Sequence, residues 1–161
     1  MQTITERIQK DIETLAQFTS TPGKGVTRSS YSKEDTMAKY YLTGEMKKIG
    51  LEIYEDGFGT LFGRREGTMK DAPVVMLGSH YDSVVNGGAF DGVAGSVSAL
   101  EVMRVLTEEG FVNDYPLELI LMNAEEGATF GPSTGVSNSR AMLGTMTQRE
   151  LETVKNRFGQ T

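Results

Sequence analysis

The spacing of apolar residues predicts a helix at the start of the chain. In residues 3–18 the large apolar side chains recur every three or four positions, as they do on one face of a helix: Ile4, Ile8, Ile12, Leu15 and Phe18. Thr3 and Glu6 have the spacing of a capping box, in which each side chain bonds a free amide of the first turn. The helix is therefore expected to begin at this pair.

A second helix is expected from Ser32, as its N-cap, to about Ile49, where Gly50 ends it. Its inward-facing residues are expected to be Met37, Tyr40 and Tyr41. After it, residues 51–56 and 60–65 flank a Gly-Phe-Gly turn and predict a β-hairpin, whose polar composition favours a position near a sheet edge.

Two continuous apolar runs predict strands, at residues 73–79 (PVVMLGS) and 117–124 (LELILMNA). Strands without polar alternation are typical of parallel sheets that are covered on both faces. Residues 92–110 between them have a helical pattern that ends at Gly110, so the segment predicts a right-handed βαβ unit. A last helix should be capped by Thr147 with Glu150. The expected fold class is α/β, with a largely parallel sheet between helices.

Composition narrows the possible roles. The 161 residues, of 17.6 kDa, suit one domain, and 22 acidic against 16 basic residues argue against nucleic-acid or membrane-surface binding. No apolar run approaches the ~20 residues of a membrane span, and the N-terminus lacks a signal-peptide pattern. A cytoplasmic protein is expected. Because there is no cysteine, any metal must be held by histidine and carboxylates.

Chemically versatile residues follow both predicted buried strands. His80, the only histidine, ends the first, and Glu125 and Glu126 follow the second. Open α/β sheets bind ligands at the carboxyl edge of their strands, where these residues should meet. If the chain stays extended, Asp82 points to the same side as His80 and can accept the second imidazole N–H, as residues behind metal ligands do.

Further carboxylates are expected at the same edge. Asp91 lies at the start of the 92–109 helix, where amide donors favour an anion, and could bridge two cations. Glu125 and Glu126 are adjacent and project differently, so one can bind metal while the other acts as a general base. Each feature also has a structural interpretation: a hydrogen-bonded histidine, solvated glutamates or a helix-capping aspartate. Their coincidence at one edge favours the metal site.

Three other motifs do not support their usual chemistry. GPSTG (131–135) matches the nucleophile elbow GxSxG by letter, but no buried strand precedes it and no histidine follows it. The glycine-rich segment after His80 lacks GxGxxG spacing, and PGKGVT (22–27) lacks the full Walker pattern. A serine hydrolase and a nucleotide-binding protein are therefore disfavoured.

Residues 78–106 (GSHYDSVVNGGAFDGVAGSVSALEVMRVL) and 123–144 (NAEEGATFGPSTGVSNSRAMLG) resemble the amidase, hydantoinase and carbamoylase group of the zinc-dependent M20 peptidase family. Residues 25–35 and 50–67 extend the likeness. The group includes allantoate amidohydrolases, N-carbamoyl-L-amino-acid hydrolases and β-ureidopropionases. The resemblance implies hydrolysis of a carbamoyl or ureido C–N bond in a small-molecule substrate, an N-carbamoyl amino acid or a ureide, by metal-activated water.

The resemblance also implies a role for each candidate residue. His80 would bind one of two divalent metal ions, Asp91 would bridge them and Glu126 would bind the second. Glu125 would be the general base and Asp82 would orient His80. The metal would be zinc, with manganese, cobalt and nickel as alternatives.

The chain departs from the group in two ways. Thr129 stands where many members have arginine, and Thr60 where asparagine is common. Members are also considerably longer, with a lid domain and further metal-binding histidines downstream. The resemblance therefore implies that residues 1–161 are the N-terminal part of a zinc-peptidase-like catalytic domain, truncated before the lid domain and the C-terminal part of that domain. With an incomplete ligand set, the isolated chain should have little or no activity.

Two other functions remain open from the sequence. A non-catalytic remnant could self-associate as a homo-oligomer, because a truncated sheet leaves an unpaired edge or an apolar patch. The second open function is that of an aminopeptidase or dipeptidase of the wider M20 family. Assays with dipeptides beside carbamoylated amino acids separate these enzyme activities.

Overall fold

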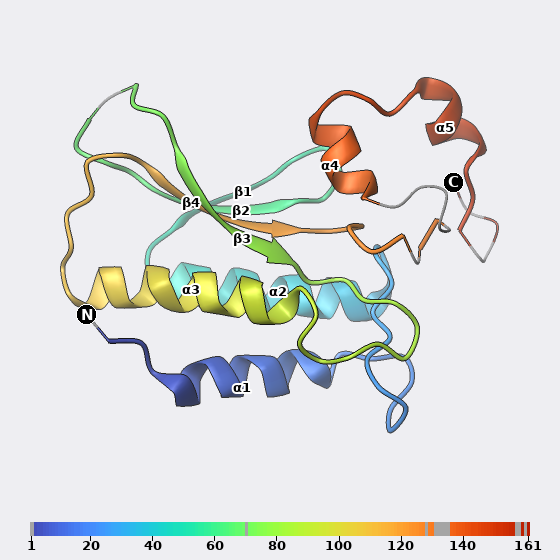
Figure 1. The fold of residues 1–161 in the computed structure, drawn as a ribbon, viewed down its shortest axis with the longest axis horizontal. Coiled ribbons are helices and arrows are strands. Elements are labelled where there is room, and N and C mark those ends of the chain that lie inside the picture. Colours follow the sequence, from blue (N-terminus) through green and yellow to red (C-terminus); the bar gives the residue numbers. More distant parts are fainter. Residues whose placement is uncertain (1, 70, 128, 131–135, 157–158, 160) are drawn as a thin grey trace.

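A computed structural model describes residues 2–69, 71–127, 129–130, 136–156, 159 and 161, and the GPSTG motif lies outside them. The described residues form one four-stranded sheet with helices on either side, so the α/β class is confirmed (Figure 1). In chain order the elements are α1 (Thr5–Ala16), α2 (Lys33–Lys48), β1 (Glu52–Glu55), β2 (Leu61–Arg65), β3 (Val75–His80), α3 (Val93–Glu108), β4 (Leu117–Met122), α4 (Ser137–Met142) and α5 (Gln148–Thr153).

The sheet has the strand order β1-β2-β4-β3 and is mixed. β3 and β4 pair in parallel across α3, as the βαβ pattern predicts, and β1 and β2 form the predicted hairpin with β1 at an edge. The largely parallel arrangement is wrong, because β2 pairs antiparallel with β4. The Arg64 guanidinium of β2 forms an ion pair with the buried Glu118 carboxylate of β4 at 2.8 Å, and this contact helps to join the hairpin to β4.

β3 is less covered than its sequence suggests. Its apolar run predicts burial on both faces, but Val75 and Met76 are 50% and 46% exposed. Among the described strands β3 pairs only with β4, and α2 and α3 cover the same face of the sheet (Figure 1). β4, which lies between two strands, is buried over its four central residues.

The hydrophobic core lies between the sheet and the layer of α2 and α3, with α1 packed on the outer side of that layer (Figure 1). In α2 the buried apolar residues are Ala38, Leu42 and Met46, spaced by four. Met37 and Tyr40 are 42% and 73% exposed, so the inward orientation predicted for them is wrong. They lie off that four-residue stripe, whereas Tyr41 packs against the core as expected.

Capping residues in the sequence predict the starts of two helices correctly and the start of a third incorrectly. Ser32 accepts the amide of Asp35, and Thr147 forms the predicted capping box, so both of these caps are confirmed. α1 begins instead after Ile4, with no side-chain cap, because the Ile4 amide donates to Glu101 of α3 at 2.8 Å. Contact with α3, and not a Thr3 capping box, sets its start. Within the described part of the chain, no helix has both the length and the apolarity that a membrane crossing needs.

The exposed edge of β3 predicts self-association. Unpaired strand edges with apolar side chains readily pair with another chain, and Val74, Val75 and Met76 are exposed here. Light scattering should give a mass above the 17.6 kDa monomer, and Val75→Lys should lower it because charge opposes strand pairing. Val102→Lys, on the exposed side of α3, is the matched control. A monomer mass for the unmodified chain at high concentration would contradict the prediction.

Candidate metal centre

His80 ends β3 opposite Met122, the last residue of β4, and is 7% exposed. Its Nδ1 lies 3.1 Å from the main-chain oxygen of Asp82 and 3.6 Å from the Asp82 Oδ1 carboxylate oxygen. A proton on Nδ1 can be donated to that main-chain oxygen, which leaves the lone pair of Nε2 available to a metal. Nε2 faces Asp91 Oδ1 at 3.7 Å and Glu125 Oε2 at 3.6 Å.

Asp82 joins the segments that follow β3 and β4. Its two carboxylate oxygens accept the amides of Glu125 and Glu126, each at 3.2 Å, and the hydroxyl of Ser30 at 3.2 Å. The sequence predicts only an orienting contact to His80. The amide contacts have no local signal, because they depend on the tertiary position of residues more than forty positions apart. Asp82 thus holds both glutamates beside the histidine.

The turn that carries the glutamates has an unusual backbone. Ala124 has φ +57°, in the left-handed region that non-glycine residues seldom occupy. Its amide donates to the Asn123 side-chain oxygen at 2.9 Å, which stabilises the turn. The turn sends Glu125 and Glu126 back toward the end of β3.

The start of α3 approaches His80 closely. Gly92 has φ +64°, and a Cβ at this position would lie 2.4 Å from the imidazole ring. Ser96, one turn into the helix, donates to the main-chain oxygen of His80 at 2.8 Å. Only glycine fits at position 92, and the close approach brings the neighbouring Asp91 to the site.

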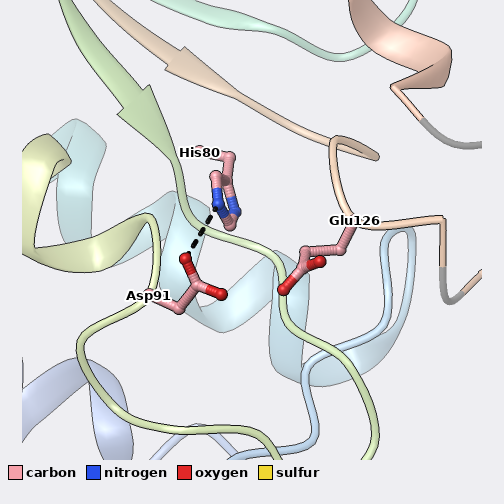
Figure 2. Close-up of side chains that lie close together, drawn as sticks. All are labelled: His80, Asp91 and Glu126. Carbon is pink, nitrogen blue, oxygen red and sulfur yellow. Dashed lines mark ion pairs between the residues drawn. The ribbon is translucent and has the colours of Figure 1, made fainter.

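His80, Asp91 and Glu126 converge, as Figure 2 shows. One ligand atom from each lies within 4.8 Å of the other two, and no other such group of three occurs among the described residues. One imidazole and two carboxylates suit zinc and similar divalent ions, and catalytic zinc usually has three protein ligands plus water. The residues therefore fit one divalent metal ion.

The charges around this cluster favour a cation. Burial lowers the pKa of His80, but the hydrogen bond and charge of Asp82 and the charge of Glu125 outweigh it, and the pKa rises to about 8. Burial, followed by the charge of Asp91, raises the pKa of Glu126. The neighbouring carboxylates contribute to both shifts, and a divalent ion would neutralise part of their negative charge.

Both threonines that depart from the family pattern are buried hydrogen-bond acceptors. The Thr129 hydroxyl accepts the amide of Ser30 at 2.9 Å, and the Thr60 hydroxyl accepts the side-chain amide of Asn138 at 2.6 Å. Through Ser30, Thr129 supports the segment that donates to Asp82. Thr60, the residue before β2, is thus bonded to Asn138 of α4, a helix that the sequence pattern did not predict.

Gly92→Ala tests the close approach of α3 to His80. The substitution should destabilise the chain by about 1–3 kcal/mol more than Gly110→Ala, because Gly110 shares its positive φ but has open space at Cβ. Urea unfolding measures the difference, and NMR resonances of the single imidazole report its displacement. Equal destabilisation with unchanged imidazole resonances would show that the ring does not pack on Gly92.

Comparisons with known proteins identify relatives of this chain. The chain is 46% identical over 154 residues to the N-carbamoyl-L-amino-acid amidohydrolase of Paenarthrobacter aurescens, covering 96% of this chain and 37% of that protein. It is 35% identical over 148 residues to the allantoate amidohydrolase of Bacillus subtilis, covering 92% of this chain and 35% of that protein. The crystal structure of a hydantoinase/carbamoylase family amidase from Burkholderia ambifaria superimposes with a TM-score of 0.90 at 31% identity. The match covers 99% of this chain and 38% of that protein.

The chain thus spans well under half the length of these relatives, and they support its place in the amidase and carbamoylase group. The sequence pattern of Peptidase family M28 matches residues 60–156, which include every candidate site residue and more than half of the chain. The chain therefore belongs to Peptidase family M28.

Proposed function

We propose that this chain forms one side of the active site of a metal-dependent hydrolase that cleaves carbamoyl or ureido C–N bonds in small molecules. The observation that carries the proposal is the convergence of His80, Asp91 and Glu126, with Glu125 beside them, at the carboxyl ends of β3 and β4. The names of the relatives support the substrate class, an N-carbamoyl amino acid or a ureide such as allantoate.

Each residue has a distinct role in this proposal. His80, Asp91 and Glu126 would hold a divalent metal, which when bound polarises a carbonyl and acidifies water. Glu125, 3.6 Å from His80 Nε2, takes the proton of the attacking water and delivers it to the leaving nitrogen as the C–N bond breaks. Asp82 holds the Glu125 amide and lies behind the imidazole, so it positions both.

The finer assignments form part of the same proposal. The resemblance to M20 enzymes implies two metal ions, with Asp91 as the bridge, and the metal would be zinc, manganese, cobalt or nickel. Shared between two ions, with His80 on one and Glu126 on the other, these residues leave both ligand sets incomplete; on the isolated chain the three together can supply the ligands of only one ion. The remaining ligands and the lid would belong to the length of the relatives that this chain does not span. The isolated chain should therefore have little turnover.

Activity is best tested in a chimera, in which residues 1–161 replace the matching segment of the P. aurescens amidohydrolase. It should release free amino acid from N-carbamoyl-L-amino acids and lose this activity with a chelator. Glu125→Gln should lower kcat about 10²–10⁴-fold without weakening metal binding, because it removes only the general base. Glu126→Gln, the matched comparison, should weaken metal binding and turnover together.

Two results would contradict the proposal. One is a Glu125→Gln chimera with undiminished kcat. The other is a chimera that cleaves dipeptides while leaving carbamoylated amino acids intact, which would favour the aminopeptidase or dipeptidase alternative.

A further inference from the structure

Asp35 is a buried carboxylate that lies outside the metal-binding group. It belongs to the first turn of α2, is 2% exposed, and its Oδ1 is buried with no hydrogen-bond partner among the described residues. Burial, opposed by the Tyr31 amide and the charge of Lys39, raises the pKa of Asp35 to about 6. The carboxyl is still mostly ionised at neutral pH, so it acts as a hydrogen-bond acceptor.

The other oxygen, Asp35 Oδ2, accepts two hydrogen bonds from segments that lead to the metal centre. One is from the Tyr31 amide at 3.1 Å and the other, longer at 3.4 Å, is from the Asn123 side-chain amide. Tyr31 follows Ser30, whose hydroxyl donates to Asp82, and it has φ +62°. Asp35 therefore contacts a segment on each side of the Asp82 carboxylate.

The contact to Asn123 determines which way that carboxamide faces. An ionised carboxylate only accepts hydrogen bonds, so the Asn123 nitrogen must point toward Asp35. The Asn123 oxygen is then directed to the Ala124 amide, which it accepts at 2.9 Å. Asn123 is fully buried, so no solvent contact can replace either bond. The reversed carboxamide would break both.

We propose that Asp35 is a positioning residue of the metal centre, because its carboxylate orients Asn123 and thereby holds the left-handed Ala124 turn that presents Glu125 and Glu126 to His80. The same carboxylate holds Tyr31 and so the Ser30 hydroxyl that donates to Asp82. Asp35 acts on the site through these neighbours. Its effect on metal binding rests on the proposed function, whereas its effect on the turn can be measured without metal.

Amide hydrogen exchange of the 161-residue chain, measured by NMR without metal, tests the inference. Asp35→Ala should speed exchange at Ala124, Glu125 and Glu126 about tenfold, the equivalent of one lost hydrogen bond. Leu119 and Leu121 of β4 should be unaffected. Asp35→Asn should behave like the unmodified chain, because its side-chain oxygen can accept from both donors. Glu34→Gln removes a charge from the same helix turn and is the matched control.

Asn123→Asp is a second variant, used in particular if Asp35→Ala does not fold. It preserves the side-chain volume and the acceptor for Ala124 but places two carboxylates face to face, so it should also speed exchange in the turn. Zinc titration adds a functional readout: Asp35→Ala or Asn123→Asp should raise the zinc Kd about 10–100-fold, and Asp35→Asn should not.

Three results would overturn the inference: unchanged exchange at residues 124–126 in the folded variants, faster exchange throughout β4, or an Asp35→Asn variant that loosens the turn as much as Asp35→Ala. The first excludes support of the turn, the second shows a general structural role, and the third shows that an acceptor at this position is not enough. If the unmodified chain binds no zinc, the proposed metal function fails while exchange still decides the role of Asp35.

Discussion

The parallel pairing of β3 with β4 is the constraint on which the metal centre depends. The register places His80 opposite Met122, so the segments that follow the two strands leave the sheet at the same edge. The Asp82 carboxylate, on the segment after β3, then accepts hydrogen bonds from the main-chain amides of Glu125 and Glu126, on the segment after β4. Without that pairing, no short-range contact would bring the histidine to the glutamates. The loop between β3 and α3 brings Asp91 to the same edge, where the neighbouring Gly92 packs against the His80 ring.

Buried polar groups maintain this edge because each contacts a specific partner. The Arg28 guanidinium, 1% exposed, donates to the main-chain oxygens of Tyr81 and Leu15, and so attaches the segment after His80 to the end of α1. Burial lowers its pKa, and the nearby charges of Asp35 and Asp82 oppose this effect. Burying a charge is costly unless it is hydrogen-bonded or paired, so these contacts make one arrangement of the loops strongly preferred.

The sequence predicts those features that depend on local spacing or strand order. The helix of α3, the hairpin and the caps at Ser32 and Thr147 arise from neighbouring residues, and they are confirmed. Convergence at one sheet edge could also be predicted, because strand, helix and strand follow one another in a βαβ unit. The roles of the site residues beyond this convergence stay predictions.

Features that depend on distant contacts could not be predicted in this way. The antiparallel pairing of β2 with β4 depends on how two distant strands meet in the folded chain, and the sequence pattern of either strand alone does not indicate it. The start of α1 depends on Glu101, which lies 97 positions from Ile4. The left-handed backbone at Ala124 likewise has no glycine to signal it, and its support comes from Asn123 and the α2 residue Asp35.

The proposed function depends on the binding of a divalent metal ion by His80, Asp91 and Glu126. Isothermal titration of the metal-free chain with zinc measures this binding. One zinc ion should bind per chain with a saturable isotherm, abolished by His80→Ala and weakened by Asp91→Asn and Glu126→Gln, with Glu13→Gln on α1 as a control that leaves binding unchanged. Absence of saturable binding, or binding that survives His80→Ala undiminished, would contradict it.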